Sequence, residues 1–335
     1  MRTRPEDLDD DEVVGALRRG WRLRVLRAEY VPVGGGSHHW LAHDDAGGRH
    51  WVTVDDLARK AFLGGTRRAA FDGLRRAFDT ALALREGGLE FVVAPVPTPA
   101  GETVRRLGAR YSVAVFPFVD GPAGRFGEPL AAAARVGLVD TIVRLHRAAP
   151  PAAAGPWPSS LRLAQRGDLE RALRSPAREW AGGPFSEPAR ALVAGHAAGI
   201  RHLLETFDRL ADRVVASGAT PVVTHGEPHP ANVVDAGGRL HLVDWDTVAL
   251  APPERDLWMI DAGAGDELAR YAEASGRRID AAAVRLYRLR WLLDDVASFV
   301  NALRSAHRRT ADTEHAWRSL VHYVESEDLS RLARR

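Results

Sequence analysis

A polar segment in the second half of the chain carries the residues whose types and spacing are best suited to chemistry. It reads Val-Thr-His-Gly-Glu-Pro-His-Pro-Ala-Asn over 223–232 and Leu-Val-Asp-Trp-Asp over 242–246. Glu227 can accept or orient the proton of a hydroxyl group, and Asn232 and Asp244 offer the oxygen ligands that Mg²⁺ prefers. Phosphoryl transfer needs these three parts, so the segment predicts a phosphoryl-transfer site.

Two prolines hold these side chains in place. Pro228 and Pro230 fix two φ angles between Glu227 and Asn232, which lowers the entropy cost of ordering the loop. Asp244 ends the next apolar strand pattern. A strand, a loop and a second strand can therefore direct all three polar groups into one pocket.

Zinc binding is the alternative chemistry for the same loop, because His225, Glu227 and His229 are all zinc-binding residue types. The intervening prolines prevent these side chains from sharing a helical face. No further ligand follows at a familiar spacing, so phosphoryl transfer is the favoured interpretation.

The elements that must position this segment begin with a sheet-rich N-terminal part. An amphipathic helix pattern at 7–18 precedes alternating patterns that predict an antiparallel meander. The predicted strands are 21–30, 38–43, 49–55, 89–93, 102–107 and 111–116, and a second helix is predicted at 66–86. The turn at 34–37 contains three glycines, whose backbone can approach a phosphate closely or simply close a hairpin.

A joint rich in proline and glycine at about 117–124 ends the sheet-rich part. Helical patterns dominate from about 128 to 215 and again after residue 253, with short strand patterns at 221–224, 233–234 and 240–243. The sequence therefore predicts two lobes. The first is 1–120, with a hinge at about 117–124, and the second is 121–335, which is mostly helical and holds the catalytic loop.

Composition excludes several classes of function. The chain has 335 residues, of which 45% are hydrophobic and 27% charged, and it has no cysteine, which excludes disulfides and thiolate metal sites. The net charge is only +2 and no basic arm stands out, so we expect no nucleic-acid partner. No apolar run approaches the roughly 20 residues that span a bilayer, and the first residues are polar. We expect a cytoplasmic protein, without a membrane partner, that is a monomer or a weak dimer.

The order of these motifs resembles the aminoglycoside phosphotransferase and choline kinase superfamily, and most of all its branch of spectinomycin phosphotransferases. The resemblance rests on His-Gly-acid-x-His-x-x-Asn at 225–232, on Asp-Trp-Asp at 244–246, and on Pro-Pro-Glu-Arg-Asp-Leu-Trp at 252–258. It covers about residues 20–300. It implies an α+β, bilobal, protein-kinase-like fold: a small antiparallel sheet lobe with one main helix, and a larger helical lobe that holds the acceptor site.

The resemblance also implies roles for the residues of the loop region. Glu227 stands where the family has its catalytic acidic residue, and Asn232 and Asp244 stand at the two magnesium positions. The residues implied to support the loop, or to face substrate or metal, are His225, His229, Asp246 and Asp256.

Contacts with both substrates are implied outside the loop. The hinge of the family, whose backbone hydrogen-bonds adenine, matches 115–121, and the C-terminal helices that carry acceptor contacts match 287–295. In those helices, Asp294 and Asp295 form an acidic pair suited to a cationic acceptor. The implied nucleotide-binding residues are Gly34, Gly35, Gly36, Ser37, Thr53, Pro117, Phe118 and Val119.

Two positions depart from the family pattern. Glu227 replaces an aspartate, and its extra methylene group moves the carboxylate by about 1 Å. Thr53 stands where the family has a phosphate-binding lysine, and the partner glutamate of the next helix is also missing, so both halves of an ion pair are absent together. The phosphate charge must then be offset by Mg²⁺, by backbone N–H groups of the 34–37 turn, by an arginine, or by Lys60, which lies beyond the strand.

The sequence therefore predicts an ATP- or GTP-dependent, Mg²⁺-requiring O-phosphotransferase that acts on a hydroxyl group of a small molecule. An aminoglycoside or aminocyclitol antibiotic such as spectinomycin is the first candidate acceptor. A metabolic kinase for choline, homoserine or a sugar is the second hypothesis, because it would use the same fold and loop. A non-catalytic pseudokinase, suggested by Thr53 and Glu227, is the third.

Overall fold

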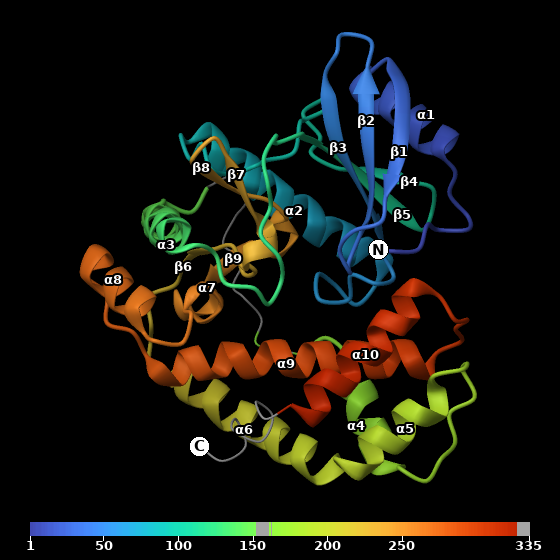
Figure 1. Ribbon diagram of the computed structural model, residues 1–335, viewed down its shortest axis with the longest axis vertical. Helices are drawn as coiled ribbons and strands as arrows, with labels where there is room; N and C mark the ends of the chain where they lie inside the picture. The colour runs from blue at the N-terminus through green and yellow to red at the C-terminus, as the bar shows by residue number, and fades with distance from the viewer. Residues whose placement is uncertain (152–160, 162, 327–335) are drawn as a thin grey trace. The chain divides into compact units, whose positions relative to one another are not determined.

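The computed structural model describes residues 1–151, 161 and 163–326, and the protein consists of two compact units (Figure 1). Unit 1 comprises Met1–Ser159 and Thr220–Ile279, and unit 2 comprises Ser160–Ala219 and Asp280–Arg335. The hinge predicted at about 117–124 lies inside unit 1. Each unit is built around its own buried apolar cores.

A five-stranded antiparallel sheet opens unit 1, in the order β1-β2-β3-β5-β4. Its strands are β1 (Val25–Val31), β2 (His38–Asp44), β3 (Arg49–Asp56), β4 (Arg105–Leu107) and β5 (Tyr111–Pro117). The predicted meander is confirmed, but its first strand begins later than 21. Trp21 ends helix α1 (Asp10–Trp21), because Arg22 adopts the left-handed conformation that terminates a helix.

The two faces of this sheet have different partners. Val52 and Val54 of β3 point into a core with α1, where both are fully buried. Strand alternation turns Thr53 and Asp55 to the opposite face. On that face helix α2 (Arg67–Glu86) packs through Leu74 and other apolar residues against β5. The predicted helix at 66–86 is confirmed.

The prediction of a strand at 89–93 is wrong. Phe91, Val92 and Val93 are buried, but the segment makes only an isolated bridge to Leu242. Leu242 N donates to Phe91 O at 2.8 Å, and Val93 N donates to Leu242 O at 3.0 Å. An apolar run reports burial, and burial alone does not distinguish a strand from an extended connection.

The remainder of unit 1 surrounds the loop at 225–232. It contains α3 (Ala132–Arg147), β6 (Val222–Thr224), β7 (Val233–Ala236), β8 (Arg239–Leu242), β9 (Ala249–Ala251), α7 (Glu254–Ile260) and α8 (Asp266–Ser275). Strand β7 forms an antiparallel hairpin with β8, and β6 pairs with β9, a strand that the sequence did not predict. Trp245 and Leu257 are fully buried in the core beneath these elements.

In the part of unit 2 that the structure describes, helices are joined by loops and no strand occurs (Figure 1). Its helices are α4 (Arg166–Arg174), α5 (Ser186–Gly195), α6 (Ala197–Ala216), α9 (Ala281–Arg304) and α10 (Ala311–Glu325). Leu203 of α6 and Leu293 of α9 are fully buried in their shared core. Helices are thus confirmed within 128–215, although 152–160 and 162 lie outside the described residues. Among the described helices, none is both long and apolar enough to cross a membrane.

Candidate phosphoryl-transfer site

The loop at 225–232, which holds the predicted catalytic residue, connects β6 to β7 and is hydrogen-bonded at both ends. A 3₁₀ turn at Pro230–Asn232 closes it, with Asn232 N donating to His229 O at 2.9 Å. Val243 N donates to Asn232 O at 3.0 Å, which ties the loop to the residue before Asp244. The two predicted magnesium ligands are therefore held by adjacent backbone.

The orientation of Asn232 follows from its hydrogen bonds. Its Nδ2 donates to Glu227 O at 3.0 Å and lies 3.3 Å from His229 Nε2. Because Glu227 O can only accept, the amide nitrogen must face it, and the amide oxygen is left for a cation. Burial lowers the pKa of His229 to about 4, so its ring is neutral and its Nε2 can accept.

Asp256 supports the loop from below. It is fully buried and accepts from His225 N at 2.9 Å and from Gly226 N at 2.6 Å. Its Oδ2 also lies 3.0 Å from His146 Nε2. Burial alone would raise the pKa of Asp256, but the hydrogen bond from His146 and the charges of His146 and Arg255 lower it below its usual value. A charged carboxylate thus holds two backbone N–H groups of the loop.

Both ring nitrogens of His225 form hydrogen bonds to the backbone. Its Nε2 donates to Val243 O at 2.9 Å, and its Nδ1 accepts from Glu227 N at 3.2 Å. Burial lowers the pKa of His225, so this neutral tautomer is retained. With both ring nitrogens occupied, His225 is unsuited to zinc. Among the described residues, no group of three or more His, Cys, Asp or Glu side chains could hold a metal ion.

Asp244 has an unusual backbone conformation. Its φ of 66° and ψ of 65° lie in the left-handed region, which is sparsely populated by residues other than glycine and often marks functional sites. Solvent reaches its side chain, yet the surrounding protein excludes enough water to raise its pKa, and the charge of Asp246 adds to this effect. Glu227 is half-buried.

Lys60 lies in a buried position that the sequence did not reveal. After β3 the chain turns back, and Lys60 is 2% exposed. Its Nζ lies 2.9 Å from Asp55 Oδ1 and 2.6 Å from Asp246 Oδ2, and it donates to Ser37 Oγ at 3.0 Å. The strand lysine and the helix glutamate are absent as the sequence indicates, and Lys60 and Asp55 form an ion pair at other positions. One signal was available, since Lys60 is the only lysine in the sequence.

The glycine turn reaches the same ammonium group. Gly34 has a φ of 73°, and a Cβ atom at Gly36 would lie 3.6 Å from Lys60 Nζ. Ser37 is buried and donates from Oγ to Asp55 Oδ1 at 2.6 Å. Gly35, in contrast, has open space around it.

Thr53 lies on the Asp55 side of β3. It is 8% exposed, and its Oγ1 lies 3.3 Å from His39 Nδ1. Burial, assisted by the positive charge of the chain's amino terminus, lowers the pKa of His39 to about 3. Thr53 therefore faces an uncharged ring.

The predicted hinge begins where β5 ends, at Pro117. Phe118 N donates to Arg49 O at 3.3 Å, and the Arg49 guanidinium lies 4.3 Å from the centre of the Phe118 ring. Val119 packs against the core between α2 and the sheet. These contacts fix the segment on the edge of the sheet lobe.

Asp294 and Asp295 belong to α9 of unit 2, whereas the other predicted site residues belong to unit 1. Asp294 Oδ1 accepts from Ala164 N at 3.2 Å, and its Oδ2 lies 3.5 Å from Arg290 Nε. Asp295 shares a hydrogen bond with Tyr323. Burial raises the pKa of both carboxyl groups, that of Asp295 to about 7.

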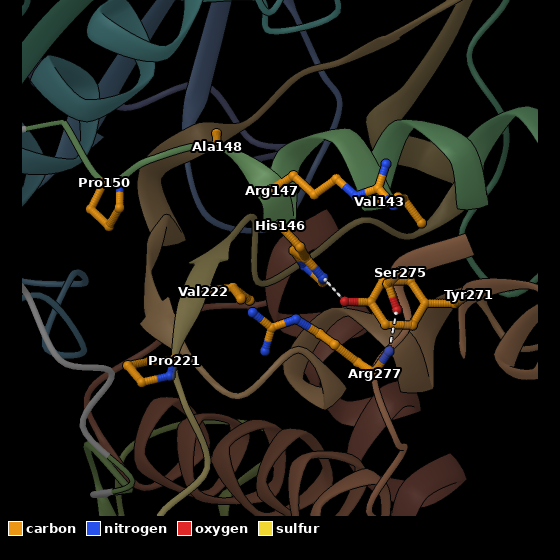
Figure 2. Close-up of a pocket in the computed structure, with 10 residues that line it drawn as sticks. All are labelled: Val143, His146, Arg147, Ala148, Pro150, Pro221, Val222, Tyr271, Ser275 and Arg277. Atoms are coloured by element: carbon orange, nitrogen blue, oxygen red, sulfur yellow. Dashed lines mark hydrogen bonds between the residues drawn. The ribbon is translucent and has the colours of Figure 1, made fainter. Parts of the chain in front are cut away.

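A cavity of about 390 Å³ lies beside the support of the loop rather than at its reactive groups (Figure 2). At its wall His146 Nδ1 lies 2.8 Å from the hydroxyl of Tyr271, and Ser275 accepts from Arg277 N at 3.2 Å. Its lining residues are Val143, His146, Arg147, Ala148, Pro150, Pro221, Val222, Tyr271, Ser275 and Arg277. None of the predicted site residues lines this cavity.

Comparison with known proteins decides the family. Residues 29–287 match the sequence profile of the phosphotransferase enzyme family, APH. The chain belongs to this family. It is therefore an enzyme, a phosphotransferase, as the motifs indicated.

Among curated proteins, this phosphotransferase is similar to Protein StrN of Streptomyces griseus. The two are 28% identical over 254 residues, which cover 74% of this chain and 76% of StrN.

Solved structures confirm the predicted α+β kinase-like fold. Spectinomycin phosphotransferase APH(9)-Ia, in complex with ADP and spectinomycin, superposes with a TM-score of 0.74 at 16% identity, over 98% of each chain. The amicoumacin kinase hAmiN, in complex with AMP-PNP and Ca²⁺, has a TM-score of 0.61 at 11% identity, over 97% of this chain and 94% of hAmiN. Choline kinase LicA from Streptococcus pneumoniae has a TM-score of 0.55 at 12% identity, over 94% of this chain and 98% of LicA.

Proposed function

We propose that this phosphotransferase transfers the γ-phosphoryl group of ATP or GTP to a hydroxyl group of an aminoglycoside or aminocyclitol such as spectinomycin, and so provides antibiotic resistance. The acceptor oxygen forms a bond to the γ-phosphorus as the bond from that phosphorus to the β,γ-bridging oxygen breaks. The nucleoside diphosphate keeps the electron pair, and the hydroxyl proton passes to Glu227. The observation that carries the proposal is the joint placement of Asn232 and Asp244 beside an ordered Glu227 loop in a member of this family.

The donor set fits a divalent cation. Three carboxylates, those of Asp55, Asp244 and Asp246, interact with the ammonium group of Lys60, and the chain's amino terminus adds a second positive charge near Asp244. The cluster therefore has more carboxylates than cations when all its groups are ionised. Asn232 Oδ1 and the Asp244 carboxylate would hold Mg²⁺, which completes its coordination with phosphate oxygens rather than with an all-protein cage. Bound there, Mg²⁺ would neutralise charge that develops on the phosphates.

Glu227 has the role of positioning the acceptor hydroxyl. Phosphoryl transfer depends mostly on positioning and charge stabilisation, so a glutamate can replace an aspartate if the loop is held accordingly. The hydrogen bonds from the loop to Asp256 and His225 provide that fixed geometry. We further propose that the 117–119 segment contacts the nucleotide base, and that Asp294 and Asp295 attract a cationic acceptor.

A metabolic kinase is the second candidate, favoured by the likeness to choline kinase LicA and to an aminopropanol kinase with a TM-score of 0.59 at 14% identity. Both candidates share the same loop chemistry, so the acceptor separates them. We propose for either case a lobe boundary near 117–124, a cytoplasmic location, and a monomer or weak dimer in solution.

A transfer assay tests the proposal directly. The purified protein is incubated with γ-³²P-labelled ATP or GTP, Mg²⁺, and a panel of aminocyclitols, aminoglycosides, choline, homoserine and sugars. We expect Mg²⁺-dependent labelling of an aminocyclitol or aminoglycoside, at least about tenfold slower in Glu227→Gln. Labelling of choline, homoserine or a sugar alone would support the metabolic alternative. No nucleotide binding at millimolar concentration would indicate a pseudokinase.

A further inference from the structure

The only lysine of the chain is buried at a point where three segments of unit 1 meet. Its ammonium group has three hydrogen-bond donors, and the structure gives each a partner: Asp55, Asp246 and Ser37. Asp246 is 186 residues away along the sequence. Burial alone would lower the pKa of Lys60, but the carboxylates of Asp246, Asp55 and Asp244 raise it, so the amine stays protonated.

The cluster of Lys60 and its carboxylates differs from a purely structural ion pair in its charge and in its hydrogen bonding. Asp55 is 1% exposed, and its Oδ2 has no hydrogen-bond partner among the described residues. Leaving a buried carboxylate oxygen unsatisfied costs stability, so such an atom calls for an explanation. The excess of carboxylates over ammonium groups points the same way, since a buried structural pair is normally neutral and fully hydrogen-bonded.

We propose that Lys60 supplies the cation that contacts the phosphate oxygens of the nucleotide, and that Asp55 is the residue that positions it. The pair would replace the lysine of the strand and the glutamate of the helix that Thr53 and the α2 sequence lack. This inference rests on the proposed function, because it concerns the donor side of the same reaction.

The path of the chain explains how Lys60 and Asp55 can replace the strand lysine and the helix glutamate. Asp55 lies on the same face of β3 as Thr53, two residues further along the strand. A lysine from the segment after the strand can reach back to that face on its flexible four-carbon stem. If Asp244 held Mg²⁺, the neighbouring Asp246 would have a second cation close by, and one N–H of Lys60 would be available to a phosphate oxygen. Asp55 and Ser37 keep the ammonium group in place.

The single lysine gives a direct spectroscopic test. Protein labelled with ¹³C,¹⁵N-lysine has one set of side-chain resonances, which report Lys60 alone. We expect the ¹³Cε and ¹⁵Nζ resonances to shift when Mg²⁺ and AMP-PNP or GMP-PNP are added, and to stay unchanged with adenosine or guanosine. If the triphosphate analogue binds but the Lys60 resonances do not move, the assignment of Lys60 is wrong.

Binding measurements on variants give a second readout. We expect Lys60→Met to weaken the affinity for the Mg²⁺–triphosphate analogue, measured by calorimetry, at least about tenfold, since a charge-assisted phosphate contact is lost. Nucleoside affinity should not change. The matched control is Arg59→Met, which removes an exposed cation from the adjacent position. Because Lys60→Met leaves two buried carboxylates without their cation, the double variant Lys60→Met/Asp55→Asn is measured beside it.

Moving the cation back to the strand separates a phosphate contact from a structural role. In the Lys60→Met/Thr53→Lys variant, we expect part of the triphosphate affinity to return, because position 53 shares a face with Asp55. Asp55→Asn should raise the KM for nucleotide while leaving the KM for acceptor unchanged. Equal losses of nucleoside and triphosphate affinity in the Lys60 variants would overturn the inference. A wild-type protein that neither binds nucleotide nor transfers phosphate would instead overturn the proposed function.

Discussion

The two units hold carboxyl groups away from water in two different ways. In unit 1, Asp55 and Asp246 contact the ammonium group of Lys60 directly. In unit 2, Asp295 has a tyrosine hydroxyl instead of a cation, and burial raises its pKa to about 7. The first cluster has a cation in direct contact with two carboxylates, whereas Asp295 of the second has a pKa near neutral pH and can gain or lose a proton there.

This difference indicates a division of labour within the proposed function. A phosphate and metal site needs permanent charge, because the triphosphate carries several negative charges at every relevant pH. An acidic pair with fewer cations than carboxylates would suit the cationic acceptor that we propose. The same residue type thus serves two purposes, decided by its neighbours.

Removing Asp244 should have the largest effect on the unit 1 site. We expect Asp244→Ala to reduce phosphoryl transfer about 100-fold or more, because the only carboxylate among the two proposed Mg²⁺ ligands is lost. Transfer rates measured across a Mg²⁺ titration would check this result, with the surface variant Asp140→Ala as the control. Full activity in Asp244→Ala would show that phosphoryl transfer does not require a metal ion at Asp244.

Removing the loop support should affect stability most strongly. Asp256→Ala leaves the buried N–H groups of His225 and Gly226 without an acceptor and His146 without its carboxylate. We expect the free energy of unfolding to fall by about 3 kcal/mol or more, as measured by urea denaturation. A change below about 1 kcal/mol would mean that water replaces the carboxylate.

Shortening the proposed catalytic acid should have an intermediate effect. The Glu227→Asp substitution withdraws the carboxylate by one methylene group. We expect kcat to fall about tenfold with little change in the KM for nucleotide, because only the positioning of the hydroxyl is altered. Steady-state kinetics would measure both constants. An increase in kcat would indicate that the shorter aspartate positions the acceptor hydroxyl better than Glu227 does.

The smallest effect is expected at Asp295 and depends on pH. Its folded-state pKa of about 7 lies above the unfolded value of about 3.9, so the folded state binds the proton more tightly. Its contribution to stability is therefore fully present below about pH 4 and is lost as the pH rises to about 7. Asp295→Asn should melt at a higher temperature than wild type at pH 8 and at a similar temperature at pH 4.

The exposed carboxylate of Asp212 in unit 2 provides the control, because Asp212→Asn should not show this pH-dependent gain. Thermal melting of both variants from pH 4 to pH 8 measures the effect. A cationic acceptor should also bind Asp295→Asn less tightly than wild type at pH 8. If the melting temperature and the acceptor affinity are both unaffected, Asp295 is not the buried carboxyl group with a raised pKa that distinguishes unit 2 from unit 1.

Most of the fold could be predicted because its patterns are local. The meander, α2 and the helices of unit 2 follow from alternation and helical spacing over short windows. The predictions failed where the sequence pattern indicates that a segment is buried but not which secondary structure it forms. The apolar segment at 89–93 is buried but extended without a full ladder, and β9 is too short at Ala249–Ala251 to show a period.

The sequence by itself determined the type of chemistry. The spacing of Glu227, Asn232 and Asp244 allows a short rigid loop and its hairpin to bring the three side chains together. Only the tertiary structure decided where the positive charge lies. Lys60 reaches Asp246 through a chain reversal after β3 and a contact across 186 residues, and no local pattern encodes such a contact. Residue spacing describes positions along one element, whereas a buried ion pair depends on how distant elements pack against each other.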